Sequence, residues 1–244
     1  MSEELNEELN EAYLSQYQEL AKMAGSLAHE IKNPLSVIRM NVDLLTEDLQ
    51  EDSSPQARRA LTKIETVHNQ CVRLENLLND FLRFARLSKL DLRAGDLNEQ
   101  VERVLDLYEA QAKDKEVEII RYLDADLPSI QLNSETLQPA LINLVKNAFE
   151  AMPDGGQLVA QSQTTRNGVA LILIDSGCGM DETTAMKMFN AFYTTKDGGS
   201  GLGLPTARKI IEAHGGRIDV QSQLGRGTQF TLEFPTPRRI MGDD

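Results

Sequence analysis

The feature that most constrains the fold is a regular series of apolar residues near the start of the chain. Their spacing alternates between four and three residues, which places one narrow apolar stripe along an α-helix and is typical of coiled coils and helical bundles. The sequence therefore predicts a long helix that needs a partner. The series consists of Leu27, Ile31, Leu35, Ile38, Val42, Leu45 and Leu49.

A second helix with the same kind of stripe follows a short break. We expect Ser54 to cap it and Pro55 to occupy its first turn. Two helices joined by a few residues form an antiparallel hairpin, but a single hairpin leaves much of both stripes in water. We therefore expect a homodimer through residues 20–88, in which two hairpins make a four-helix bundle. The second stripe consists of Leu61, Ile64, Val67, Cys71, Leu74, Leu78, Phe81 and Ala85.

The rest of the chain shows a mixed pattern of helices and strands. We expect residues 87–95 to be a linker and residues 175–203 to contain a mobile glycine-rich region. Several strands follow one another as hairpins, which favours a two-layer α/β sandwich. The predicted fold class is therefore α+β. The expected helices are 97–113, 134–152, with Ser134 as its candidate cap, and 204–213. The expected strands are 117–123, 158–164, 169–174, 217–222 and 228–234.

Four segments follow from these patterns. Residues 1–20 are a helical lead-in, either a solvated extension or a signal-carrying coiled coil, and residues 21–90 form the hairpin. Residues 91–236 form the sandwich domain, and residues 237–244 are a tail.

Composition limits the partners and the compartment. The formal net charge of -13 argues against nucleic acid and anionic membranes as main partners. Cys71 and Cys178 lack metal-like spacing and are interpreted as reduced thiols. There is no apolar run long enough to span a membrane, so we expect no membrane segment in this chain. The expected location is the cytoplasm, with the alternative that the chain is the cytoplasmic portion of a longer membrane receptor.

His29 is the first candidate for chemistry. It lies about 200° around the helix from the apolar stripe and is expected to face water. Glu30 follows it, and Asn33 stands one turn further along on the same face. An exposed imidazole beside a carboxylate can act as a nucleophile; the alternative is an ordinary surface histidine. We expect Pro34 to bend the helix here.

Three further motifs contain residues suited to a nucleotide. Asn143 and Asn147, one helical turn apart with Lys146 between them, suit a hydrated Mg²⁺ and phosphate oxygens, or they satisfy each other. Asp175 ends an apolar strand, where its carboxylate can accept from an exocyclic amine; the alternative is a plain turn. The glycines of residues 199–203 precede a helix and can form an anion cradle, or they are a disordered loop.

Together these motifs resemble those of a sensor histidine kinase of two-component signalling, over nearly the whole chain. The phosphoacceptor box of that family is similar to His29-Glu30-Ile31-Lys32-Asn33-Pro34-Leu35. The remaining boxes, in the family's order, are matched by Asn143 with Asn147, by residues 175–179, by residues 189–196, by residues 199–203 and by residues 225–228.

The resemblance implies a function and a set of roles. His29 would be phosphorylated from ATP and would pass the phosphoryl group to an aspartate of a response regulator receiver domain. Glu30 would be the acid/base partner. Asn33 would position water when the kinase acts as phosphatase on the regulator. Regulator contacts are expected on exposed positions such as Arg39, Met40 and Asp43.

The nucleotide site is implied in the same way. Asn147 and Asn143 would hold Mg²⁺, with Lys146 nearby. Asp175 would bind the adenine amino group, assisted through water by Thr228. The other implied contacts are Gly177 and Gly179, which shape the adenine pocket, Lys196, Gly201, Leu202 and Gly203, which meet the phosphates, and Phe189 and Phe192, which anchor a lid over residues 180–200.

Two other functions are compatible with the same motifs. One is an ATPase or serine kinase on the same ATP-binding fold, and the other is a nucleotide-binding dimer that only relays conformation.

The two remaining histidines are expected to be structural: His68 beside the second stripe, and His214 as a cation at a helix C-terminus.

Overall fold

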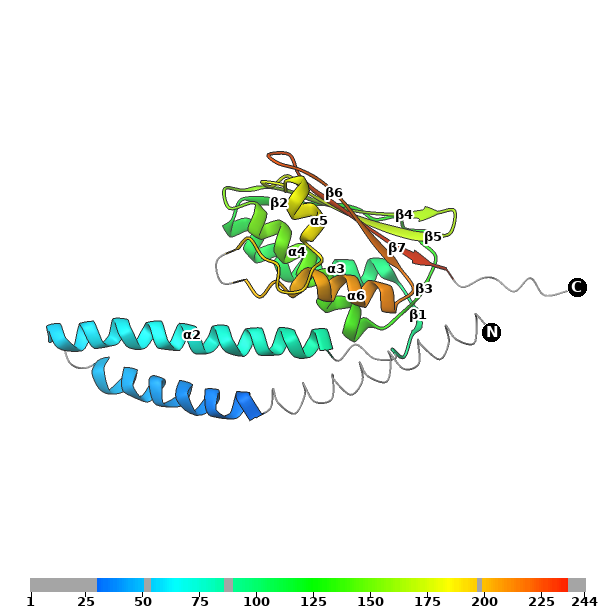
Figure 1. The fold of residues 1–244 in the computed structure, drawn as a ribbon. Coiled ribbons are helices and arrows are strands. Elements are labelled where there is room, and N and C mark those ends of the chain that lie inside the picture. The colour runs from blue at the N-terminus through cyan, green and yellow to red at the C-terminus, as the bar shows by residue number, and fades with distance from the viewer. Residues whose placement is uncertain (1–29, 51–53, 86–89, 197–198, 237–244) are drawn as a thin grey trace, which may run out of the picture. The chain divides into compact units, whose positions relative to one another are not determined.

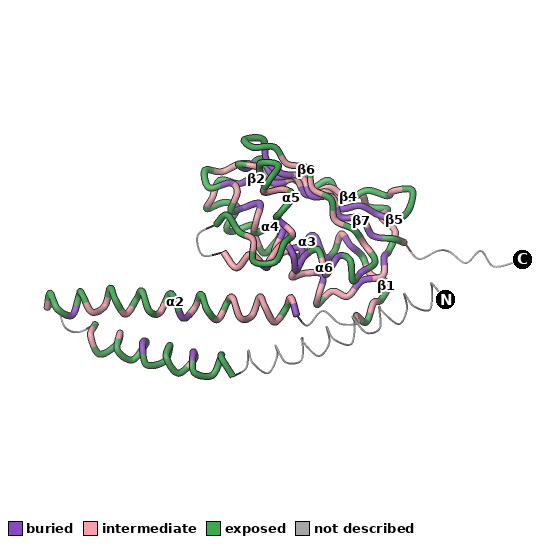
Figure 2. Tube along the Cα trace, viewed as in Figure 1, coloured by how far each residue is buried: buried purple, intermediate pink, exposed green. Residues whose placement is uncertain are grey.

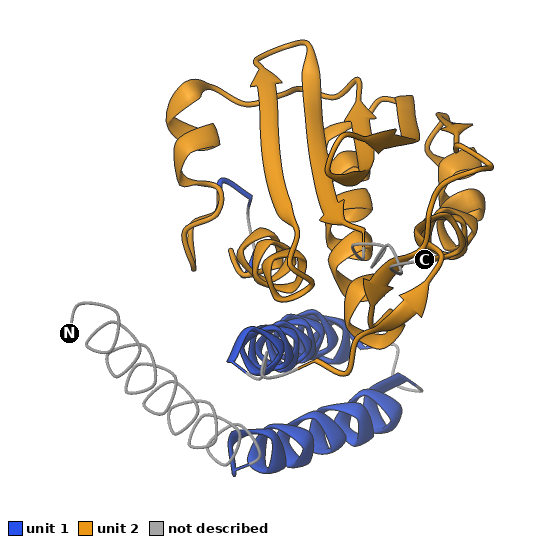
Figure 3. Ribbon diagram, turned by 90° about the vertical axis from the view of Figure 1, so that its right-hand side faces the viewer, with its two compact units in different colours: residues 1–88, 195–200 blue, residues 89–194, 201–244 orange. Residues whose placement is uncertain are grey.

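The computed structural model describes residues 30–50, 54–85, 90–196 and 199–236 (Figure 1). The chain divides into two compact units, coloured separately in Figure 3. The first comprises residues 1–88 and 195–200, and the second comprises residues 89–194 and 201–244. His29 lies outside the described residues.

The first unit contains two long helices. Residues 30–50 are helical without a break at Pro34, and α2 runs over Pro55–Ala85. The predicted start of α2 is confirmed, because Ser54 Oγ accepts a hydrogen bond from the Ala57 N–H at 3.1 Å.

Two polar side-chain contacts give the direction of these helices. Arg39 lies 3.2 Å from Glu75, and Asp43 lies 3.5 Å from His68. A later residue of the first helix thus pairs with an earlier residue of α2, so the helices are antiparallel and the predicted hairpin is confirmed.

The predicted stripe of the first helix is divided between two environments. Leu35 and Val42, seven residues apart, are buried with 6% and 7% of their surface exposed. Ile31, Ile38 and Leu45, also seven residues apart, keep 45%, 47% and 50% of their surface exposed. Figure 2 shows most of this helix as exposed. Half of the stripe therefore remains uncovered on a single chain.

The second unit is a five-stranded sheet with helices packed on one face (Figure 1). The strand order is β2-β4-β5-β7-β6, with β2 parallel to β4 and every other pair antiparallel. The predicted two-layer α/β sandwich is therefore confirmed. Its helices are α3 (Leu97–Asp114), α4 (Ser134–Ala151), α5 (Glu182–Lys187) and α6 (Gly203–Ala213). Its strands are β1 (Arg93–Gly95), β2 (Val117–Tyr122), β3 (Ile130–Leu132), β4 (Gly156–Thr165), β5 (Gly168–Asp175), β6 (Arg217–Gln223) and β7 (Gly227–Pro235).

Alternating side chains of the sheet form the core with α3, α4 and α6. Along β7 the residues at every second position from Thr228 to Phe234 are buried, as period-two burial against one helical layer requires. The largest fully buried side chains of this layer include Phe149, Leu144, Leu158, Leu171 and Ile211.

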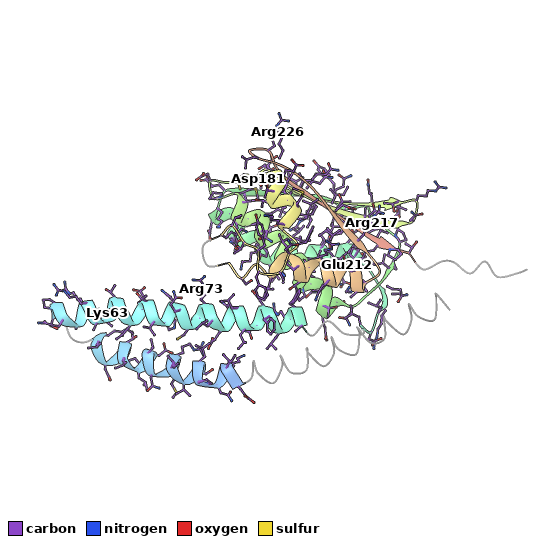
Figure 4. The ribbon with its side chains drawn as sticks, in the orientation of Figure 1. Lys63, Arg73, Asp181, Glu212, Arg217 and Arg226 are labelled. Atoms are coloured by element: carbon purple, nitrogen blue, oxygen red, sulfur yellow. The ribbon has the colours of Figure 1, made fainter. Side chains whose placement is uncertain are left out.

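Three local predictions were wrong. Arg93–Gly95, expected within the linker, forms β1 and pairs antiparallel with β3. Asp181 caps α5, inside the region expected to be glycine-rich and mobile (Figure 4). The N-cap of α4 is Asn133, whose Oδ1 accepts from the Thr136 N–H at 3.1 Å, and not Ser134.

None of the helices in the described part of the chain combines the length and the apolar character needed to cross a bilayer.

Candidate functional site

Three polar residues lie in a row across the ends of neighbouring strands. The strand register pairs Asp175 of β5 with Thr228 of β7, and Thr228 with Ser222 of β6. Directly paired residues of antiparallel strands have their side chains on the same face of the sheet. Asp175 and Thr228 are buried, with 4% and 6% of their surface exposed. A buried carboxylate and two hydroxyls thus share the edge of the core.

Backbone N–H groups hold the Asp175 carboxylate in place. Its Oδ1 accepts from the Gly177 N–H at 2.9 Å and from the Thr228 N–H at 3.2 Å. A buried carboxylate is costly unless hydrogen bonds compensate its charge, and bonds to backbone donors do so. The carboxylate is therefore oriented before any ligand arrives.

Ser222 joins this row from the neighbouring strand. Its Oγ accepts from the Met180 N–H at 2.8 Å and lies 3.0 Å from both Gly227 O and Thr228 Oγ1. Sequence reasoning missed Ser222, because only the register of β6 against β7 places it beside Thr228. The signal in the sequence is the short turn at residues 224–226, whose tip is marked by Arg226 in Figure 4.

Gly177 and Gly179 are required by the chain's own backbone. A Cβ at Gly177 would lie 2.6 Å from Ala151 O at the end of α4. Gly179 has φ +63°, and a Cβ there would lie 2.0 Å from Gln223 O of β6. Only glycine allows both approaches. The turn after β5 is therefore packed tightly between α4 and β6.

The asparagines of α4 lie where α6 begins. The Asn143 amide Nδ2 donates to Gly203 O at 3.1 Å, which joins α4 to the first residue of α6. This bond leaves the Asn143 Oδ1 as the oxygen that it can offer to a cation. Asn147 stands one turn further along α4 and is half-buried. Among the described residues, no side chain caps the N-terminus of α6, at Leu202.

Lys146 lies on a more exposed side of α4. Its Nζ is 3.8 Å from Glu150 Oε1, and 63% of its side chain is exposed. Glu150 also raises the pKa of Tyr108, after the larger effect of that residue's burial.

Two contacts hold the segment before α6, and one of them joins it to that helix. Arg208 of α6 lies over the Phe189 ring, 5.3 Å from its centroid, in a cation–π contact. The Phe192 N–H donates to Gly201 O at 3.0 Å. The Phe192 ring is 64% exposed, so its predicted role as an apolar anchor is wrong and its backbone makes the attachment.

Three other predicted site residues belong to the first unit. Glu30 and Asn33 are exposed on the first helix of the first unit. Lys196 belongs to residues 195–200, which group with the first unit. Within the second unit, the predicted residues that lie together are Asp175, Gly177, Gly179 and Thr228 at one corner, and Asn143 and Gly203 at the other.

The donor set fits Mg²⁺ better than a softer metal. Mg²⁺ prefers oxygen ligands and keeps waters or phosphates in its coordination sphere. In the part of the chain that the structure describes, no three His, Cys, Asp or Glu side chains come together as a metal site. Amide oxygens of Asn143 and Asn147, with phosphate oxygens, would form the site.

Two family models match the chain. Residues 19–90 match the His Kinase A (phospho-acceptor) domain. Residues 132–238 match the histidine kinase-, DNA gyrase B- and HSP90-like ATPase. The chain therefore belongs to the histidine kinases and carries the two domains of their catalytic core.

Three individual relatives are similar to this chain over 88% of its length. Sporulation kinase E of Bacillus subtilis (strain 168) is 32% identical over 217 residues, which is 88% of this chain and 28% of that protein. The crystal structure of full-length ShkA in complex with AMPPNP is 27% identical, with a TM-score of 0.73 over 88% of this chain and 46% of that one. Histidine kinase ThkA in complex with response regulator protein TrrA is 27% identical, with a TM-score of 0.64 over 88% of this chain and 61% of that one. The chain spans only part of such relatives: 28% of the length of sporulation kinase E and 52% of that of sporulation kinase C of the same organism.

Proposed function

We propose that this chain is an ATP-dependent protein-histidine kinase of two-component signalling, which phosphorylates its own His29. The observation that carries the proposal is the preoriented Asp175 carboxylate beside Thr228, in a domain of the ATPase family that follows a phosphoacceptor domain. In domain terms, residues 21–90 would be the dimerisation and phosphotransfer hairpin, and residues 91–236 the ATP-binding domain.

The second unit would bind ATP through its two corners. Asp175 would accept from the adenine amino group, with Thr228 assisting through water. Mg²⁺ would be held by the oxygens of Asn147 and Asn143 and would neutralise phosphate charge. The position of Gly201, Leu202 and Gly203 at the start of α6 supports phosphate binding there, because helix N-termini attract anions. Lys196 would add a positive charge, and Lys146 would remain near Asn147.

His29 would then be the nucleophile. Its ring nitrogen distal to the main chain attacks the γ-phosphorus of ATP, the bond to the β-phosphate oxygen breaks, and ADP leaves with that electron pair. Glu30 takes the imidazole proton. The phosphoryl group next moves to an aspartate carboxylate of a response regulator. In the phosphatase activity, Asn33 would position the water that hydrolyses the regulator's acyl phosphate.

The uncovered half of the apolar stripe supports a homodimer. Ile31, Ile38 and Leu45 stay about half-exposed on a single chain, and a second hairpin would cover them in a four-helix bundle. The complex of ThkA with TrrA supports a receiver domain as the other partner. Met40 is exposed and available for such a contact. Arg39 and Asp43 already contact residues of α2, so a regulator that binds at these positions would contact both helices.

Labelled ATP tests the proposal. The chain is incubated with Mg²⁺ and ATP labelled at the γ-phosphate, beside His29→Ala, Asn147→Ala and, as matched control, His68→Ala. We expect acid-labile, base-stable label on the wild type and on His68→Ala, and none on the other two. Label that survives His29→Ala would favour a serine kinase, and nucleotide hydrolysis without label would favour an ATPase.

The phosphatase activity has its own variant. Asn33→Ala should autophosphorylate normally but dephosphorylate the regulator more slowly. Unchanged dephosphorylation would remove Asn33 from the mechanism.

A further inference from the structure

Ser222 makes three polar contacts at the edge of the proposed adenine site, yet it has no role in the scheme above. We infer that Ser222 is a specificity-determining positioning residue, which orients the Thr228 hydroxyl so that the site offers only hydrogen-bond acceptors to position 6 of the purine. The inference rests on the proposed binding of ATP at Asp175.

Counting hydrogens gives the direction of each bond. A serine hydroxyl has one hydrogen to donate and two lone pairs. Ser222 must accept from the Met180 N–H, 2.8 Å away, and it can only donate to the Gly227 carbonyl oxygen, 3.0 Å away. Its remaining lone pair faces Thr228 Oγ1 at 3.0 Å. Thr228 must therefore donate to Ser222, and this is the only assignment that satisfies all three contacts.

The Thr228 hydroxyl is then an acceptor toward any ligand. Its only hydrogen is directed at Ser222, so its lone pairs are what it can present elsewhere. Asp175 lies beside it, with Oδ1 3.2 Å from the Thr228 nitrogen, and an ionised carboxylate is also acceptor-only. A water that gives both of its hydrogens to these two residues would likewise present only lone pairs.

Such a site distinguishes purines by the group at position 6. The amino group of adenine supplies the hydrogens that the site requires. The oxo group of hypoxanthine or guanine would place its lone pairs against those of Asp175 and Thr228. Without Ser222 the Thr228 hydroxyl can rotate and donate to an oxo group, so discrimination falls.

The test compares ATP with ITP, its 6-oxo analogue without a 2-amino group. Dissociation constants of both are measured by calorimetry, with Mg²⁺, on the full chain. For Ser222→Ala we expect the ITP-to-ATP ratio of dissociation constants to fall about two- to tenfold, as expected for one hydrogen bond. Ser222→Thr keeps the hydroxyl and should keep the ratio. The matched control is Ser162→Ala, which removes a buried hydroxyl that accepts the Asp124 N–H at 2.9 Å, and it should leave the ratio unchanged.

Two results would overturn the inference. One is a Ser222→Ala protein whose affinities for ATP and ITP fall by the same factor, which would make Ser222 purely structural. The other concerns Thr228→Val, which removes the oriented hydroxyl without changing Ser222. This variant also provides the test if Ser222→Ala does not fold. Its ratio should also fall, and an unchanged ratio contradicts the assignment. A wild type that binds neither nucleotide refutes the proposed function itself.

Discussion

At the scale of single residues, the Asp175 carboxylate is the group on which nucleotide recognition depends. Asp175→Asn keeps an Oδ1 that can accept the Gly177 and Thr228 N–H groups, but it replaces the charged acceptor with an amide. We expect the fold to survive and ATP affinity to fall about ten- to hundredfold, as for loss of a hydrogen bond to a charged group. Calorimetric binding and a thermal melt measure the two effects. Near-native affinity with a lowered melting temperature would show a structural role only.

Residue types at motif positions could be predicted from the sequence, but their neighbours could not. Asp175 ends an apolar strand, and that position alone predicts that its carboxylate can accept a hydrogen bond from a ligand. The partnership of Ser222 with Thr228 depends on strand register, which a turn of three residues sets and no periodicity encodes. The glycines were attributed to ligand approach, whereas Gly177 and Gly179 also let α4 and β6 come close.

At the scale of elements, His214 joins the two helices of the site at their far ends. It was predicted to be a cation near a helix C-terminus, and that reason is wrong. Its Nε2 accepts the Asn133 N–H at 3.1 Å, and its Nδ1 lies 2.7 Å from Ile210 O, so the ring bridges α6 to the N-cap of α4 as a neutral tautomer. The Asn133 side chain also donates to Asp91 O, two residues before β1.

Removing this bridge should destabilise the second unit. His214→Leu keeps a side chain of moderate size but leaves the half-buried Asn133 N–H without its acceptor. We expect the free energy of unfolding to fall by about 1–3 kcal/mol, measured by urea denaturation. His68→Leu, which loses only a surface ion pair, should stay within about 0.5 kcal/mol of wild type. Equal losses in both variants would refute the bridge.

The start of α5 should depend on pH through Asp181. Its backbone and side-chain hydrogen bonds with Thr184 lower its pKa from the ordinary value of 3.8. A carboxyl whose pKa is lower in the folded state stabilises the fold above its ordinary value, and that contribution is lost as the pH falls through the folded pKa. We expect hydrogen exchange at the Thr184 amide to accelerate in that range, and Asp181→Asn to abolish the pH dependence. An identical acceleration in Asp181→Asn would show that another group causes the pH dependence.

Long periodic elements were predictable, and short ones were not. The helices and strands of six residues or more were found because their apolar residues recur with a helical or strand period, apart from α5. β1 and β3 have three residues each and α5 has six, too few to display a period. They form because β3 offers an edge to β1 and because Asp181 caps α5.

At the scale of the whole molecule, the uncovered stripe on the first helix predicts dimerisation. Ile38→Glu would place an unpaired carboxylate from each chain in the seam, at a cost of about 3–5 kcal/mol each, so the dimer should dissociate. Val37 is the matched control, because it is adjacent and 54% exposed against 47% for Ile38, but it lies off the stripe. Sedimentation velocity should find Val37→Glu dimeric and Ile38→Glu monomeric. A dimeric Ile38→Glu protein would place the interface elsewhere.

The central claim is that ATP bound at the Asp175 site phosphorylates His29. The most direct measurement is mass spectrometry of peptides prepared at alkaline pH after incubation with Mg²⁺ and ATP. The account predicts the mass of one phosphoryl group on the peptide containing His29, lost on acid treatment. In Asp175→Asn at the same subsaturating ATP concentration, its initial rate of formation should be about ten- to hundredfold lower. A phosphoryl group on a serine or threonine, or on His68 or His214, or an unmodified His29 in a chain that hydrolyses ATP, would contradict it.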